Sequence, residues 1–280
     1  MRPLQSRGRK ETAMLYLTPF FTIYSCVLAA VFGACMGSFL NCMAWRIVHG
    51  ESVLRGRSHC DVCGHVLTAG DLVPIVSYLA HKGRCRWCGA KLSARHVLAE
   101  AATAATFVAL LLKYDISLQA LEYTLFACLL LACAFADLEG YMIPDRFILA
   151  GIVLRLVSLF CIDGWKENWL DAVLGGLAVG GVLLAVVLLY EKLRKTEAMG
   201  GGDIKLLVMT GLWLGWKRNI VCLLFACVLG VACGLVSARR GSGQEDGERK
   251  LIPWGPSIAA AAIVTLLCGN EIVAAYLSLF

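Results

Sequence analysis

The chain has 280 residues, of which 59% are hydrophobic and 16% are charged, and its mean hydropathy is +0.72. Soluble globular domains have about half apolar and a quarter charged residues, so this composition excludes an ordinary soluble domain. The formal net charge is +6. We therefore expect a membrane protein that crosses the bilayer several times.

Eight apolar runs are candidates for transmembrane segments. Crossing the hydrocarbon takes about 20 apolar residues in a helix, and helices satisfy their own backbone groups in lipid. The sixth run is short, a length that also fits a re-entrant segment, so seven full spans with a half-helix is the alternative. We expect an all-α polytopic fold with about eight transmembrane helices at residues 15–44, 97–112, 118–136, 147–162, 170–190, 204–216, 220–237 and 256–270.

Residues 1–45 form a basic tail and the first apolar run. This run is too long for a cleaved signal peptide and lacks a small-residue cleavage pattern, so we expect it to remain as a membrane anchor. Two sets of glycines in the apolar runs predict close helix packing, because small residues let helix backbones approach each other. They are Gly33 with Gly37, and Gly175, Gly176, Gly180 and Gly181.

Residues 46–96 form a polar loop with two Cys-x-x-Cys pairs, Cys60 with Cys63 and Cys85 with Cys88. This spacing is typical of a tetrahedral four-thiolate zinc site. A glycine follows each pair and permits a tight turn, and a reducing cytoplasm argues against disulfides. We expect structural zinc, because closed four-cysteine sites stabilise small folds and metal binding supplies their folding free energy.

Two alternatives to four thiolates holding a structural zinc stay open for this loop. A histidine could replace one cysteine as a ligand, and the thiols could have redox or catalytic work. All five histidines lie in or beside the loop: His49, His59, His65, His81 and His96.

Two aspartates lie at the ends of apolar runs in the remaining segment, where charge is expensive and marks a functional site. Asp137 ends the third run, and Asp203 follows Gly200, Gly201 and Gly202. Two aspartates that share one proton can hydrolyse a peptide bond, because the ionised one activates water while the protonated one polarises the carbonyl. Three glycines would let an extended substrate approach Asp203 closely.

Structural interpretations compete with catalysis for the aspartates. Asp137 could be a solvated residue at the membrane boundary, and Asp203 could cap the sixth helix. Asp145 directly follows Pro144 and has the sequence context of a helix cap.

The distribution of lysine and arginine predicts the topology. The loops 46–96, 191–205 and 238–250 are basic and are expected in the cytoplasm, which leaves both termini outside. This threading brings Asp137 and Asp203 to the cytoplasmic membrane surface. Four basic residues in the tail argue against it: Arg2, Arg7, Arg9 and Lys10.

The chain resembles the bacterial type IV prepilin peptidases, also called leader peptidases with N-methyltransferase activity. The resemblance runs from about residue 30 to residue 270, and the order of its motifs is specific. The motifs are Gly33-Ala-Cys-Met-Gly-Ser-Phe-Leu-Asn41, Trp45-Arg46, Arg57-Ser-His-Cys60 with its paired knuckle, Asp71-Leu-Val-Pro74, Ser77-Tyr78-Leu79, Glu100, Asp137 through Pro144-Asp145, Gly200-Gly-Gly-Asp203-Ile-Lys205 and Gly255-Pro-Ser257.

The resemblance implies that Asp137 and Asp203 are the catalytic aspartates of a GxGD membrane protease. It implies cleavage of the basic leader of prepilins or pseudopilins, after a glycine, at the cytoplasmic face of the bacterial cytoplasmic membrane. It also implies methylation of the new amino-terminal residue by S-adenosylmethionine, for which no glycine-rich nucleotide fingerprint is present. The expected partners are these substrates and the membrane, with no nucleic acid.

The expected organisation has three parts. Residues 1–45 are a tail and the first transmembrane helix, residues 46–96 a cytoplasmic four-cysteine zinc loop, and residues 97–280 a membrane helical bundle carrying the protease site. One alternative is a membrane aspartic protease for another substrate, without methyltransferase activity. The other is a zinc-stabilised membrane scaffold or thiol carrier, in which the aspartates are helix caps.

Overall fold

The computed structural model describes residues 14–16, 18–53, 56–60, 62–163, 165–194, 199–239 and 253–278. Within these ranges the chain forms helices and loops, with two isolated β-bridges and no strand, so the predicted all-α fold class is confirmed. Arg2, Arg7, Arg9 and Lys10 of the basic tail lie outside the described residues, as does most of the loop 238–250.

Nine α-helices and three short helical turns make up the described fold. The turns are η1 (Met14–Tyr16), η2 (Leu159–Asp163) and η3 (Leu177–Gly181). The α-helices are α1 (Pro19–Val48), α2 (Val76–Ala80), α3 (Ala94–Tyr114), α4 (Leu118–Gly140), α5 (Asp145–Ser158), α6 (Trp165–Gly176), α7 (Val182–Arg194), α8 (Gly201–Arg239) and α9 (Gly255–Leu277).

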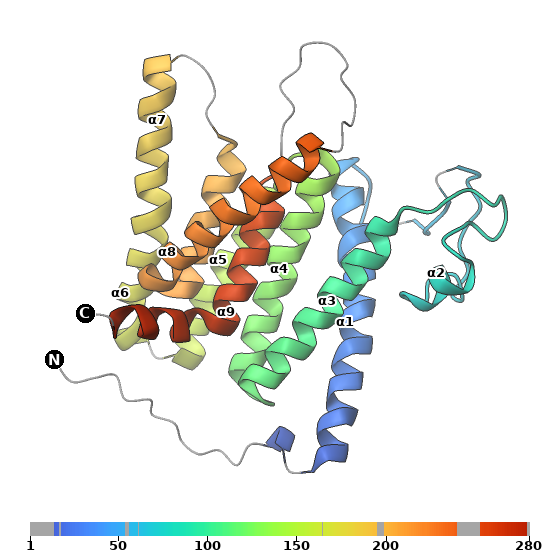
Figure 1. Cartoon of the computed structure of the whole chain (residues 1–280), viewed down its shortest axis with the longest axis horizontal. Helices are drawn as coiled ribbons and strands as arrows, with labels where there is room; N and C mark the ends of the chain where they lie inside the picture. Colours follow the sequence, from blue (N-terminus) through green and yellow to red (C-terminus); the bar gives the residue numbers. More distant parts are fainter. Residues whose placement is uncertain are drawn as a thin grey trace.

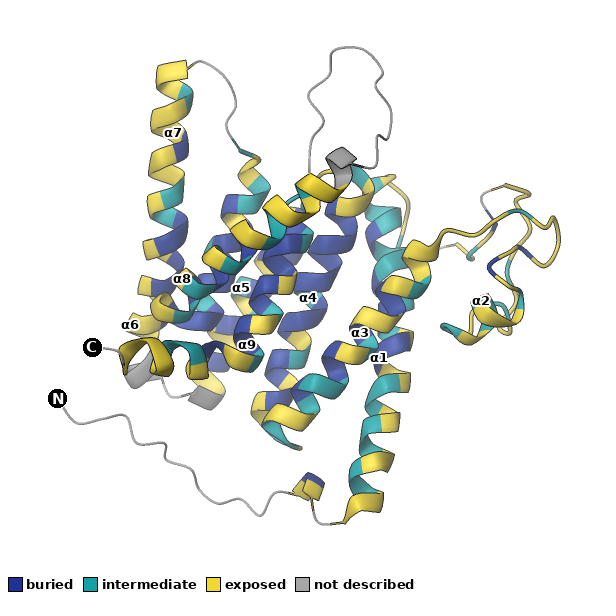
Figure 2. Cartoon of the chain, viewed as in Figure 1, coloured by how far each residue is buried: buried dark blue, intermediate teal, exposed yellow. Residues whose placement is uncertain are grey.

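Helix α4 lies in the middle of the bundle (Figure 1). Helices α1 and α3 pack against each other on one side of it, and α8 and α9 pack together on the other side, with α9 also contacting α4. The loop that contains α2 projects from the side of the bundle, next to α1 and α3. Figure 2 shows that buried residues concentrate along α4, while the outward faces of the peripheral helices are exposed.

Among the residues that the structure describes, six helical segments are long and apolar enough to cross a membrane. Their outward side chains include many large exposed apolar residues, such as Phe20, Val31, Phe32 and Leu184, which suits contact with lipid rather than water. The chain is therefore an integral membrane protein. The six segments are Pro19–Val48, Ala94–Tyr114, Leu118–Gly140, Trp169–Arg194, Gly201–Val236 and Gly255–Leu277.

The predicted count of eight spans is not confirmed. The predicted spans 204–216 and 220–237 both lie in α8, which turns at Gly215, where φ is 76° and ψ is 167°. The predicted span 147–162 corresponds to α5 and η2, and α5 has only 14 residues. Helix α5 and η2 are consecutive and together run from Asp145 to Asp163, but this stretch is not among the six apolar segments.

The predicted glycine packing is confirmed at most positions. A Cβ atom on Gly33 would lie 2.8 Å from the Cα of Ala104, so this glycine lets α1 and α3 touch backbone to backbone. A Cβ atom on Gly175 would lie 2.2 Å from the carbonyl oxygen of Gly211, so this glycine lets the backbones of α6 and α8 touch as well. The prediction is wrong for Gly181, which borders open space.

Candidate active site and metal centre

Asp137 lies in the last turn of α4 and is buried, with 5% of its surface exposed. Its Oδ2 atom accepts a 2.8 Å hydrogen bond from the backbone N–H of Gly255, the first residue of α9. A Cβ atom on residue 255 would lie 2.8 Å from the same Oδ2 atom. The end of α4 and the start of α9 therefore hold one carboxylate between them, and only glycine leaves it undisturbed.

Asp203 lies in the first turn of α8 and is half-buried. Its backbone N–H donates a 3.1 Å hydrogen bond to the carbonyl of Gly200. A helix N-terminus favours a carboxylate, because its unpaired N–H groups carry partial positive charge. Asp203 lies within the electrostatic reach of Asp137. The structure thus brings the two predicted aspartates together from helices that are far apart in sequence.

The three glycines before Asp203 have different surroundings. Gly201 borders open space, and the one heavy atom near a Cβ on Gly200 would be Oδ2 of Asp203, at 3.4 Å. A Cβ on Gly202 would lie 3.1 Å from the Cβ of Ile143, in the segment that joins α4 to α5. Gly200 and Gly201 leave room beside Asp203, whereas Gly202 is explained by packing.

Asp145 does not have the capping role that its sequence context predicts. Pro144 occupies the cap position of α5, and the carboxylate of Asp145 instead pairs with Lys205 at 2.7 Å. Both side chains are mostly exposed. An exposed ion pair contributes at most about 1 kcal/mol, so this contact ties the starts of α5 and α8 together only weakly.

The four loop cysteines form one cluster. The Sγ atoms of Cys60, Cys63, Cys85 and Cys88 all lie within 4.8 Å of one another, and those of Cys60 and Cys88 are 4.0 Å apart. Zinc–sulfur bonds of about 2.3 Å in a tetrahedron place sulfurs about 3.8 Å apart. The cluster therefore has the donor type, number and spacing that a structural zinc ion needs, and it contains no histidine among the described residues.

The two cysteine pairs are held by matching hairpins. In the first, the N–H of Cys60 donates to the carbonyl of His65 and a β-bridge joins His59 to Val66. In the second, the N–H of Cys85 donates to the carbonyl of Ala90. The glycines that follow the pairs, Gly64 and Gly89, have φ values of 69° and 72°, as a tight turn after each pair requires.

The environment of Cys85 also suits metal binding. Hydrogen bonds from the backbone N–H groups of Cys88 and Trp87 lower the pKa of Cys85 to about 7. Thiolates, rather than thiols, bind metal. The pKa of Cys88 is instead raised, to about 11, by burial and by the neighbouring thiols, so the preference for the thiolate is specific to Cys85.

One residue of the aspartate site had no predicted role. In the sequence, Gly255 stands out only as part of a Gly-Pro-Ser string at the start of the last apolar run. A glycine followed by proline at the start of a helix was the available signal, but its contact with Asp137, 118 positions earlier, is tertiary.

Comparisons with known proteins give the same outline. Residues 31–114 match the Bacterial Peptidase A24 N-terminal domain, and residues 124–235 match the Type IV leader peptidase family. The chain is 32% identical to the prepilin leader peptidase/N-methyltransferase of Bacillus subtilis (strain 168), an alignment that covers 89% of this chain and 96% of the relative.

Two further relatives carry the same name. The Pseudomonas putida protein is 32% identical over 91% of this chain and 95% of its own length. The Aeromonas hydrophila protein is 35% identical over 80% of this chain and 76% of its own length. No solved structure matches the chain.

Proposed function

The chain belongs to the type IV leader peptidase family, and on that basis we propose that it is a membrane aspartic endopeptidase that removes the leader of prepilins or pseudopilins. The observation that carries the proposal is that Asp203, at the start of α8, lies within electrostatic reach of Asp137, at the end of α4. We assign the catalytic roles to this pair. The names of the relatives also support a second activity, methylation of the new amino-terminal residue.

In the proposed mechanism the two aspartates share one proton. The ionised carboxylate takes a proton from a water molecule, which attacks the scissile carbonyl, while the protonated carboxyl donates a hydrogen bond to the carbonyl oxygen. The N–H of Gly255 occupies one oxygen of Asp137 and so fixes the orientation of that carboxylate. The other oxygen of Asp137 and the carboxylate of Asp203 are then the groups available to water and substrate.

The membrane positions the substrate in this proposal. A prepilin presents a basic leader followed by an apolar helix, so its leader stays at the cytoplasmic surface while its helix enters the bilayer. We place the active site at the cytoplasmic face of the bacterial cytoplasmic membrane. The open space at Gly200 and Gly201 supports an approach of the extended leader segment beside Asp203.

Zinc has a structural role in the proposal. The four-cysteine cluster is closed, because four protein sulfurs complete a tetrahedron and leave no position for water or substrate. The metal would join the two hairpins and keep the loop folded beside α1 and α3. S-adenosylmethionine is the proposed methyl donor of the second activity.

The experiment that tests the proposal is cleavage of a prepilin-like substrate by the purified protein in liposomes, with the product mass measured. Loss of the leader and a gain of one methyl group are expected when S-adenosylmethionine is present. Cleavage without methylation would support a protease-only enzyme. Absence of cleavage of prepilin-like substrates by the folded, zinc-loaded protein would overturn the proposal.

A further inference from the structure

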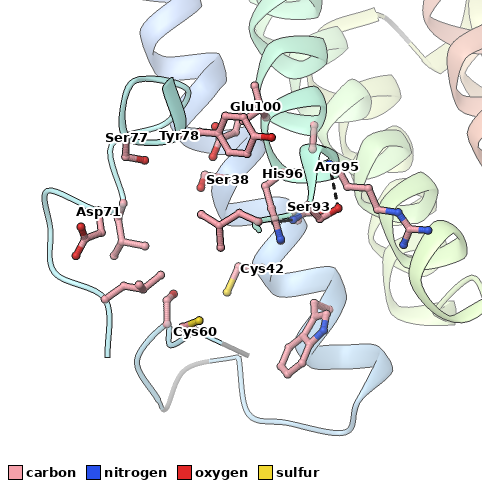
Figure 3. A pocket seen from close by; sticks show the side chains of 18 of the residues that line it. Ser38, Cys42, Cys60, Asp71, Ser77, Tyr78, Ser93, Arg95, His96 and Glu100 are labelled. Carbon is pink, nitrogen blue, oxygen red and sulfur yellow. Dashed lines mark hydrogen bonds between the residues drawn. The ribbon is translucent and has the colours of Figure 1, made fainter. Parts of the chain in front are cut away.

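A hollow of about 660 Å³ lies between α1, the cysteine loop, the first turns of α3 and the end of α4 (Figure 3). Ser38 from α1 and Ser77 and Tyr78 from the loop side lie around it with Glu100 of α3. The volume falls within the range of small-molecule sites, about 300–1,000 Å³. The hollow is separate from the space between Asp137 and Asp203, because neither aspartate lines it.

One edge of this hollow is built from a strained turn. Ile75 has φ 61° and ψ −50°, and the N–H of Val76 donates a 2.5 Å hydrogen bond to the carbonyl of Pro74. This is the rare γ-turn geometry, which is strained for a β-branched residue. The buried carboxylate of Glu100 accepts a 2.7 Å hydrogen bond from the N–H of Ile75 and holds the turn in place. Strain of this kind concentrates at ligand clamps.

The walls carry both signs of charge together with aromatic rings. Five arginine and four carboxylate side chains line the hollow, and Trp45 and Tyr78 contribute rings. Hydrogen bonds from the hydroxyl and the N–H of Thr68 hold the pKa of Asp71 below its usual range, so this carboxylate is ionised at neutral pH. The lining can therefore bind an ammonium, a carboxylate and a flat ring at once.

This chemistry fits a zwitterionic nucleoside better than a basic peptide. S-adenosylmethionine has a carboxylate for an arginine, an ammonium for a carboxylate and an adenine for an aromatic ring. A prepilin leader is rich in lysine and arginine, so it could pair with the four carboxylates of the lining but would offer no carboxylate to the five guanidinium groups.

The end of α4 lies between this hollow and the aspartates. Asp137 faces α9 through Gly255, whereas Glu139, which lines the hollow, lies 3.8 Å from Arg95 of α3. Residues two apart on an α-helix point about 200° apart, and the helix is about 10 Å wide. The hollow and Asp137 thus lie on opposite sides of the last turn of α4. An amino terminus released beside Asp137 would reach the hollow by moving around this one turn.

We propose that this hollow is the binding site for S-adenosylmethionine, and that the new amino terminus reaches it around the last turn of α4. The proposal rests on the methyltransferase part of the proposed function. The terminal ammonium first gives a proton to water. The amine nitrogen then bonds to the methyl carbon of the donor, and the carbon–sulfur bond breaks with its electron pair left on sulfur. A methylammonium and a neutral thioether result.

The test is equilibrium binding of S-adenosylmethionine to the full-length protein in detergent, measured by calorimetry without any peptide substrate. We expect Ser38→Phe, which fills the hollow, to weaken binding at least tenfold. Cys35→Phe, one turn away on the exposed face of α1 and outside the lining, is the matched control and should bind like the wild type. Ser77→Phe fills the hollow from the opposite wall. It replaces Ser38→Phe in the binding measurement if the Ser38→Phe protein is not produced in folded form.

The outcomes separate this inference from the proposed protease function. Asp203→Asn should lose cleavage and still bind the donor within about twofold of the wild type. Wild-type affinity in both hollow-filling variants would overturn the proposal and leave the peptidase intact. Displacement of the donor by a basic leader peptide would instead assign the hollow to the leader. Loss of donor binding and of cleavage together in the folded wild type would count against the proposed function itself.

Discussion

The backbone N–H of Gly255 and the Oδ2 atom of Asp137 are 2.8 Å apart and form a hydrogen bond that joins the start of α9 to the end of α4. This bond uses the first unpaired N–H of a helix, where partial positive charge collects. It fixes the carboxylate of Asp137 in a buried position. The position of one proposed catalytic group therefore depends on a residue that has no side chain.

Gly255→Ala should reduce leader cleavage about ten- to a hundredfold while the protein still folds. The new methyl group would lie 2.8 Å from Oδ2 of Asp137 and displace the carboxylate, and a shift of about 1 Å at a reacting group can reduce the rate a hundredfold. Initial rates on a prepilin-like substrate, with thermal melting alongside, measure both effects. Ala260→Ser, on an exposed position of α9, is the control. A normal rate for Gly255→Ala would show that the orientation of Asp137 is unimportant.

Asp137→Asn and Asp203→Asn should each reduce cleavage by at least about a hundredfold, because an amide can neither take a proton from water nor share one with its partner. Asp145→Asn is the matched control, since Asp145 lies in the same segment but forms only an exposed ion pair with Lys205. It should stay within a few-fold of the wild-type rate. The measurement is the cleavage rate divided by the amount of folded, membrane-inserted protein. A folded Asp203→Asn variant that still cleaves would refute the catalytic assignment.

The local features of this chain were predictable from its sequence. Long apolar runs predict helices because lipid leaves the backbone no other partner, and the structure has helices at each run. The two Cys-x-x-Cys pairs predict a four-sulfur cluster, and their Sγ atoms lie together. Gly64 and Gly89 adopt the positive φ values that their places after the cysteines suggest.

The count of eight spans is not confirmed, because hydropathy alone does not reveal how consecutive apolar runs are joined or how long each helix is. The predicted spans 204–216 and 220–237 both lie in α8, on the two sides of the kink at Gly215, where φ is 76° and ψ is 167°. The contact between Gly255 and Asp137 and the hollow beside Glu100 are tertiary, and each joins residues that no local pattern relates. The local sequence around Asp145 predicts a helix cap, because its ion-pair partner, Lys205, is 60 residues away and leaves no local signal.

Cys60→Ser should lower the zinc content of the purified protein and its steady-state level more than its cleavage rate per molecule. The four sulfurs lie within 4.8 Å of one another, and a closed site of this kind contributes folding free energy rather than chemistry. Metal analysis, quantitative immunoblotting and initial rates give the three quantities. Cys268→Ser, an exposed cysteine outside the cluster, should change none of them. Normal zinc and normal abundance in Cys60→Ser would rule out this metal site.

Gly215→Ala should destabilise the bundle by about 1–3 kcal/mol, because φ 76° with ψ 167° is a backbone region that essentially only glycine adopts. The added methyl would also lie 2.1 Å from a carboxylate oxygen of Asp171 on α6. Gly215 is 12 residues, or about 18 Å of helix, from Asp203. We therefore expect a lower melting temperature in detergent with a near-normal cleavage rate below that temperature. Gly181→Ala, which points into open space, should melt like the wild type. Equal melting of the two variants would show that the turn at Gly215 carries no strain.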